Sequence, residues 1–216
     1  KRGAHLIGLT GNPGAGKSTL TAELVKVFRN NGEKVAVIAV DPTSPFSGGA
    51  ILGDRIRMQE HYSDPGVFIR SVATRGVLGG ISHSTRDLIA MFDALGFGRV
   101  IVETVGVGQD EVDIAFTVDT NLVVCLPETG DGVQMIKAGL METADIFVLN
   151  KADLFGADKA HRQLEQLVSI AKSRPDGWVV PVCSTIAQTG SGIVGLVDVM
   201  KGHLSHINAQ TVGTYS

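Results

Sequence analysis

The chain has 216 residues, of which 44% are hydrophobic, and a formal net charge of −3 at pH 7. This length and apolar content suit one domain with a sizeable core, whereas the slight acidic excess argues against a broad basic surface for nucleic acid or an anionic membrane. The longest strongly apolar runs, such as Val35–Val40, are strand-length and too short for a membrane helix of about 20 residues, and no secretory signal pattern is present at the start.

Strand-like apolar runs alternate with helix-like segments along the chain. The predicted elements, in chain order, are strand 4–10, helix 17–30, strand 34–41, strand 67–72, helix 81–95, strand 99–105, strand 121–127, helix 132–142, strand 145–150, helix 157–173, strand 178–184 and helix 193–206. Continuous apolar strands separated by helices indicate a three-layer α/β fold, with a mostly parallel central sheet flanked by helices. Residues 1–207 are expected to form this domain, and 208–216 a flexible polar tail.

The two cysteines, Cys125 and Cys183, lie in strand-like runs. They are predicted to be reduced core residues rather than a disulfide or a metal-binding pair. Together with the absence of a membrane or secretion signal in the sequence, this favours a cytoplasmic enzyme.

A phosphate-binding motif follows the first predicted strand, where Gly11–Ser18 reads Gly-Asn-Pro-Gly-Ala-Gly-Lys-Ser. This is the P-loop pattern, whose glycines let backbone N–H groups surround phosphates at a helix N-terminus. Lys17 is predicted to reach the β- and γ-phosphates and Ser18 to hold Mg²⁺. The predicted nucleotide-binding residues here are Gly11, Asn12, Pro13, Gly14, Ala15, Gly16, Lys17, Ser18 and Thr19. The motif predicts a P-loop NTPase that binds a nucleoside triphosphate.

A second motif, Asn150-Lys151-Ala152-Asp153, follows the apolar strand 145–150. An Asp carboxylate there can accept two hydrogen bonds from guanine N1–H and the exocyclic amine, whereas adenine offers no such donor pair. The motif therefore predicts guanine, and a helix start with Asp153 as its N-cap remains the alternative. The loop after the last strand would add Thr185, Ile186 and Ala187, with the Ala187 N–H directed at guanine O6.

Acidic residues at the carboxyl ends of two strands are candidates for a magnesium site. Asp41 ends the second predicted strand and Glu103-Thr104 ends the fourth, and Mg²⁺ favours a few carboxylates together with phosphate oxygens. Asp54 and Arg57, three residues apart, would share one helical face and could meet metal and phosphate. A helix cap, a core-edge acid and a surface ion pair are the respective alternatives.

With these motifs together, the chain resembles the MeaB/ArgK family of GTPases, the G-protein chaperones of adenosylcobalamin-dependent acyl-CoA mutases such as methylmalonyl-CoA mutase. The similarity covers most of residues 5–195. It is carried by Gly11–Ser18, Asp41–Met58, Phe68–Gly80, Glu103–Glu111, Glu128–Glu142 and Asn150–Asp153.

The resemblance implies roles for individual residues. It implies Mg²⁺ ligation by Ser18, Asp41, Asp54, Glu103 and Thr104, with the Val40 carbonyl nearby. Nucleotide contacts are implied for Arg57, Asn150, Lys151 and Asp153. A switch that couples nucleotide state to the mutase would include Asp131, Gln134 and Lys137. Independently of the resemblance, hydrolysis of GTP is expected to depend on Lys17 and Glu103, and Gln109 and Asp110, just past Glu103, are candidates for orienting the attacking water.

Other functions are weighed against this one. A small-metabolite kinase shares the P-loop but has no need of a guanine motif. A transport-associated ATPase of the lysine/arginine/ornithine type would prefer ATP. A metal-insertion GTPase would carry His- or Cys-rich stretches, which this sequence lacks. Free-standing family members carry extensions on both sides of the GTPase core, so the chain is expected to be a bare GTPase domain or a short form, and a homodimer is left open.

Overall fold

The computed structural model of the chain describes residues 3–41, 58–61, 63–73, 83–104, 114–127, 138–171 and 174–213. Within these residues, one sheet of seven parallel strands has the spatial order β3-β2-β4-β1-β5-β6-β7. The strands are β1 His5–Gly11, β2 Val35–Asp41, β3 Val67–Ala73, β4 Arg99–Thr104, β5 Thr120–Cys125, β6 Ile146–Leu149 and β7 Val182–Ser184. The prediction of a parallel central sheet is confirmed, and β1 lies at its centre between β4 and β5.

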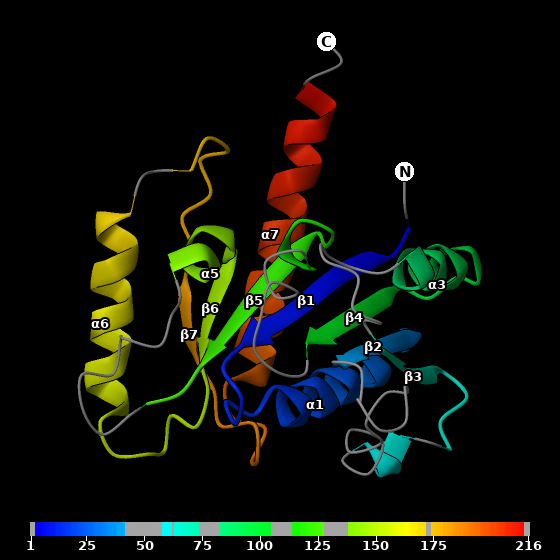
Figure 1. The fold of residues 1–216 in the computed structure, drawn as a ribbon, viewed down its shortest axis with the longest axis horizontal. Helices are drawn as coiled ribbons and strands as arrows, with labels where there is room; N and C mark the ends of the chain where they lie inside the picture. The colour runs from blue at the N-terminus through cyan, green and yellow to red at the C-terminus, as the bar shows by residue number, and fades with distance from the viewer. Residues whose placement is uncertain are drawn as a thin grey trace.

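Helices cover both faces of the sheet, which gives the three layers that the sequence predicts (Figure 1). The helices are α1 Lys17–Asn30, the short 3₁₀ helix η1 Gln59–His61, α3 His83–Ala94, α5 Ala138–Thr143, α6 Ala157–Ile170 and α7 Ile193–Gly213. One core cluster joins α1 and α7 to the sheet. Two further clusters lie on the opposite face, one under α3 and one under α5 and α6.

The pleat of the central strand explains this division. Ile7 and Leu9 of β1 pack in the cluster with α1 and α7, whereas Leu6 packs in the cluster with α3. All three are fully buried, because both faces of a parallel sheet are covered. Burying each such side chain contributes roughly 1.5–3 kcal/mol, so the apolar run in the sequence fixes the position of β1 and of the loop that follows it.

Among the described residues, two predicted elements have an end that is shifted by four residues or more. The last strand begins at Val182 rather than 178, because Pro181 has no N–H to donate to a ladder, although its carbonyl accepts from Phe147 N–H at 2.9 Å. Helix α7 continues to Gly213, beyond 206 and through most of the segment predicted as a tail. Its last turns are held because His206 and Gln210 donate to the Asp176 carbonyl. The division of the chain at residue 207 stays a prediction.

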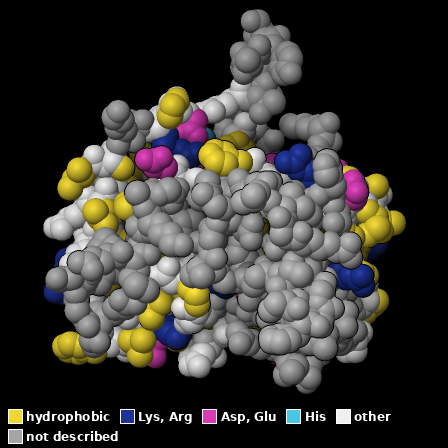
Figure 2. All heavy atoms as spheres, in the orientation of Figure 1, with side chains coloured by type: hydrophobic (Ala, Val, Ile, Leu, Met, Phe, Trp, Pro, Cys, Tyr) yellow, Lys and Arg dark blue, Asp and Glu magenta, His cyan; other side chains and the backbone are white. Residues whose placement is uncertain are grey.

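The two cysteines form no disulfide, and charges of both signs are mixed on the surface (Figure 2). Cys125 and Cys183 are free thiols, and burial raises the pKa of Cys125 to about 12, so its thiol stays protonated. On the face drawn in Figure 2, the coloured Lys and Arg side chains are scattered and interspersed with acidic ones. Among the described residues, no helix is both long and apolar enough to cross a membrane.

A buried polar chain links β1, β5 and α7 at the amino ends of the strands. Thr120 Oγ1 lies 2.7 Å from His5 Nε2 and 2.9 Å from His203 Nδ1, so its single proton can serve one histidine while its oxygen accepts from the other. His203 Nε2 faces Asp145 Oδ1 at 3.5 Å. Burial, helped by the charges of Arg99 and His203, lowers the pKa of His5 to about 3. Burial also lowers the pKa of His203, against the opposing charge of Asp145.

We expect acidification to destabilise the fold through these histidines. An unfolded histidine binds a proton below about pH 6.5, whereas the folded pKa of His5 is about 3, so stability is complete above pH 6.5 and falls as the pH decreases below it. The loss between pH 7 and pH 5 is expected to be about 2 kcal/mol for His5. Urea unfolding at both pH values should show a smaller loss for His5→Gln, and an unchanged loss would contradict the assignment.

Candidate functional site

The P-loop connects the centre of the sheet to the start of α1. Its backbone has φ of +124° at Gly11, +78° at Gly14 and +88° at Gly16, a region that residues with a Cβ rarely adopt. A side chain at Gly11 would also collide with the Val124 carbonyl of β5. The first turn of α1 contains no acidic residue. The loop therefore presents a helix N-terminus to the carboxyl edge of the sheet, as an anion site requires.

Lys17 extends back along this loop. Its side chain is buried, and its Nζ donates to the carbonyl oxygens of Gly11 at 2.6 Å and Asn12 at 3.1 Å. These contacts hold the ammonium group against the main chain of the loop that would surround the phosphates. A nucleotide would exchange these neutral acceptors for charged phosphate oxygens, which form stronger hydrogen bonds.

Glu103 meets two hydroxyl groups of α1. Ser18 Oγ donates to Glu103 Oε1 at 2.6 Å, and Thr21 Oγ1 lies 2.9 Å from Glu103 Oε2. Glu103 is 1% exposed, and it reaches α1 because β4 lies directly beside β1, with Glu103 opposite Leu9. The sequence prediction placed Ser18 and Glu103 in one site, and the structure brings them together.

The other predicted metal ligands have different positions. Val40 of β2 pairs with Thr104 of β4, and Asp41 is the last residue of β2. Thr104 lies one residue beyond Glu103, so its side chain points to the opposite face, where its hydroxyl donates to the Leu9 carbonyl at 3.2 Å. The structure thus does not bring the Thr104 hydroxyl to Ser18. The predicted residues Asp54, Arg57, Gln109, Asp110, Asp131, Gln134 and Lys137 lie outside the described residues, as does the Asp41 side chain.

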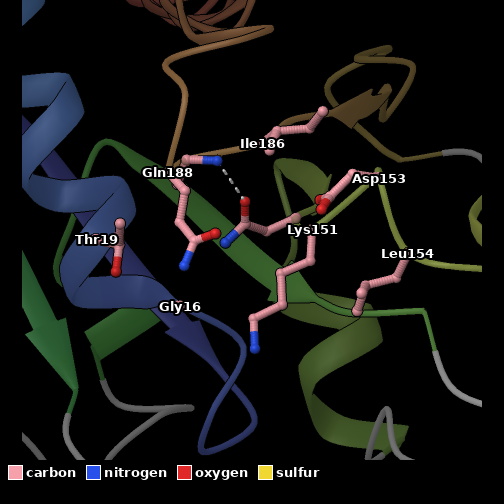
Figure 3. A pocket seen from close by; sticks show the side chains of 9 residues that line it. Gly16, Thr19, Lys151, Asp153, Leu154, Ile186 and Gln188 are labelled. Atoms are coloured by element: carbon pink, nitrogen blue, oxygen red, sulfur yellow. Dashed lines mark hydrogen bonds between the residues drawn. The ribbon is translucent and has the colours of Figure 1, made fainter.

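A pocket lies between the P-loop and the two predicted base loops. Its lining residues are Gly16, Thr19, Asn150, Lys151, Asp153, Leu154, Ile186, Ala187 and Gln188. Figure 3 shows the Gln188 side chain between Thr19 and Lys151, and the Asp153 carboxylate at the side of Ile186. Lys151 has φ of +57°, a left-handed conformation that turns the chain sharply between the end of β6 and Asp153. The predicted guanine residues therefore surround one cavity.

Asn150 joins the parts of this site. Its side-chain Nδ2 donates to the Ala15 carbonyl of the P-loop at 2.9 Å. Its Oδ1 accepts from Thr185 Oγ1 at 3.1 Å and from Ala187 N–H at 3.0 Å. Asn150 is 2% exposed, and a buried amide with all three contacts holds three loops in fixed relation.

Sequence reasoning missed Thr21, Leu154 and Gln188. Thr21 had a signal, since it stands three residues after Ser18 and so shares its face of α1. Leu154 and Gln188 adjoin predicted base residues, but nothing in their type indicated that they line the pocket. Among the described residues, no group of three or more His, Cys, Asp or Glu side chains is placed to hold a metal ion.

Comparisons with known proteins identify relatives over nearly the whole chain. The family model described as "Methylmalonyl Co-A mutase-associated GTPase MeaB" matches residues 2–214. A putative GTPase of Pyrococcus horikoshii is 56% identical over 202 residues, which are 93% of this chain and 64% of the relative. The mouse "Methylmalonic aciduria type A homolog, mitochondrial" is 36% identical over 198 residues, which are 90% of this chain and 48% of the relative. The chain thus spans about half to two thirds of the length of these relatives.

A solved structure has the same fold. The crystal structure of a LAO/AO transport system kinase superposes on this chain with a TM-score of 0.77 at 32% sequence identity. The superposition covers 96% of this chain and 61% of the kinase chain.

Proposed function

Because the chain belongs to the family of methylmalonyl-CoA mutase-associated GTPases, we propose that it binds GTP with Mg²⁺ and hydrolyses it to GDP and phosphate. We further propose that its nucleotide state controls the loading or protection of the cofactor in an adenosylcobalamin-dependent acyl-CoA mutase. The family description and the name of the mouse relative support this choice of partner.

One observation supports the GTPase proposal above the others: Asn150 hydrogen-bonds both to the P-loop and to the loop of Ala187. In this proposal the phosphate site and the base site are neighbouring parts of one nucleotide site, held together by Asn150. Asp153 lies on the wall of that pocket, where its carboxylate can accept from guanine N1–H and the exocyclic amine. Adenine would leave this carboxylate without donors, a mismatch that discriminates strongly.

The residues beside the P-loop fit a magnesium ion. The hydroxyl of Ser18 and the buried carboxylate of Glu103 are hard oxygen donors 2.6 Å apart. Mg²⁺ usually takes one or two protein oxygens and fills its other positions with phosphates and water, so a cluster of three acidic residues is unnecessary. We propose Ser18 and Glu103 for this site, together with Asp41 and Asp54 from the sequence pattern. When bound, the ion would neutralise charge on the β- and γ-phosphates.

The described residues would act by positioning and charge. Backbone N–H groups of residues 14–18 would surround the β-phosphate, and Lys17 would move from the Gly11 and Asn12 carbonyls to the γ-phosphate oxygens. Charge that develops in phosphoryl transfer is then met by an ammonium group and a helix N-terminus that are already oriented. The water attacks in line with the breaking bond, and Gln109 remains the predicted residue to orient it.

Hydrolysis of GTP and of ATP, each with and without an adenosylcobalamin-dependent acyl-CoA mutase from the same source, tests the proposal. We expect turnover of GTP alone and a higher rate when the mutase is present. A rate that the mutase leaves unchanged at saturating concentration would contradict the partner, and a preference for ATP would contradict the base assignment and favour the transport-associated ATPase. Transfer of phosphate to a small acceptor would favour a kinase.

Lys17→Ala is expected to lower the single-turnover rate of GTP hydrolysis by about 100- to 1000-fold, the usual effect of removing one donor to developing charge. The affinity for GDP should fall less, because the backbone N–H groups of the loop remain. Lys26→Ala is the matched control, since Lys26 is on the same helix but pairs with Glu23 and Glu60. Equal rates for Lys17→Ala and the control would contradict the role of Lys17.

A further inference from the structure

Both oxygens of the Glu103 carboxylate are contacted by α1. Ser18 donates to Oε1 at 2.6 Å, and the Thr21 hydroxyl lies 2.9 Å from Oε2. Thr21 is fully buried. Because Thr21 follows Ser18 by three residues, one helix face presents two hydroxyl groups to one carboxylate.

The Thr21 hydroxyl has one proton and two acceptors within reach. The second acceptor is the Lys17 carbonyl, at 3.0 Å. In an α-helix that carbonyl already accepts the N–H of the residue four positions later, which is Thr21 itself. A carboxylate is also the stronger acceptor, so the proton goes to Glu103. The contact with the Lys17 carbonyl selects the rotamer of Thr21 and so directs its hydroxyl at Oε2.

We propose that Thr21 is a positioning residue for the magnesium site: its hydroxyl holds Glu103 Oε2 so that Oε1 stays directed at Ser18. This rests on the proposed function, in which Ser18 and Glu103 serve Mg²⁺. The terminal torsion of a glutamate is broad, so a contact on Oε1 constrains the plane of the carboxylate less than contacts on both oxygens do. The second hydrogen bond fixes the plane of the carboxylate, as the narrow octahedral geometry of Mg²⁺ requires.

The hydroxyl and the methyl group of Thr21 can be tested separately. Thr21→Val keeps the shape and the buried volume but leaves Oε2 without this donor, whereas Thr21→Ser keeps the donor and loses the methyl group. If Thr21 only filled space in the core around α1, the serine variant would be the more damaged of the two. If Thr21 positions Glu103, the valine variant would be.

The release of a fluorescent GDP analogue, measured across a Mg²⁺ titration and in EDTA, separates the metal site from the rest of the pocket. Thr21→Val is expected to raise the Mg²⁺ concentration needed to slow release by about tenfold, the effect of losing one hydrogen bond to a charged group. In EDTA its release rate should equal that of the unsubstituted protein. Thr21→Ser should restore the Mg²⁺ requirement to within about threefold.

Thr120→Val is the matched control, because Thr120 is equally buried but lies at the amino end of β5, in the polar chain with His5 and His203. It should lose stability without a change in the Mg²⁺ requirement. An unchanged Mg²⁺ requirement in Thr21→Val, a faster release in EDTA as well, or a serine variant that behaves like valine would each overturn the positioning role. Failure of the unsubstituted protein to bind GDP would instead contradict the proposed function.

Discussion

Asp153→Asn is expected to lower the affinity for GTP by about 100-fold and to create affinity for xanthosine triphosphate, the two hydrogen bonds to the base being responsible. Xanthine has a carbonyl oxygen where guanine has its exocyclic amine. An asparagine can donate to that oxygen through its amide nitrogen and accept from N1–H through its amide oxygen. Guanine would face the amide nitrogen with its own amine, so two donors would oppose one another.

Competition between GTP and xanthosine triphosphate for a bound fluorescent nucleotide measures this exchange. Asp158→Asn is a matched control, since Asp158 is an exposed carboxylate in the first turn of α6 and is not on the pocket wall. The control should keep its preference for GTP. The alternative role of Asp153 as a helix N-cap is not what the structure has, since Gly156 is the N-cap of α6. If Asp153→Asn also kept that preference, the base would be recognised elsewhere.

The elements around the site could be predicted because the local sequence determines them. Leu6, Ile7 and Leu9 are apolar on both faces of one strand, which places β1 in the sheet interior. The glycines that follow can adopt the positive φ that the P-loop needs. Glu103 was assigned to the same edge since parallel strands end on one side of a sheet.

Contacts between segments far apart in the chain could not be predicted in the same way. The spacing of Thr21 from Ser18 places both on one face of α1, but only the spatial order of β4 beside β1 brings Glu103 to Thr21. The sequence predicts a shorter α7, because its last turns are a polar stretch without helical periodicity. In the structure these turns are stabilised by hydrogen bonds from His206 and Gln210 to the Asp176 carbonyl. In each case a tertiary partner overrides a weak local pattern.

Replacing Asn150 is expected to affect both the stability of the fold and the affinity for nucleotide. Asn150→Ala is expected to destabilise the fold by about 3 kcal/mol, because it leaves the Ala15 carbonyl, the Thr185 hydroxyl and the Ala187 N–H without their buried partner. It should also weaken the binding of every nucleotide, whatever its base, since the P-loop and the base loops would no longer be held at a fixed distance. Urea unfolding and the GDP dissociation constant measure the two effects.

The loss of affinity for every nucleotide, whatever its base, distinguishes the role of Asn150 from that of Asp153. Added to Asp153→Asn, the substitution Asn150→Ala should reduce the new affinity for xanthosine triphosphate just as it reduces the affinity for GTP in the single variant, because Asn150 holds the P-loop and the base loops together whichever base is bound. Asn121→Ala is the matched control: Asn121 is a buried amide of β5 that donates to the Thr143 carbonyl at 3.0 Å. It should lose stability and keep its affinity for GDP. Should Asn150→Ala behave like this control, the P-loop and base loops would hold their spacing through the sheet alone.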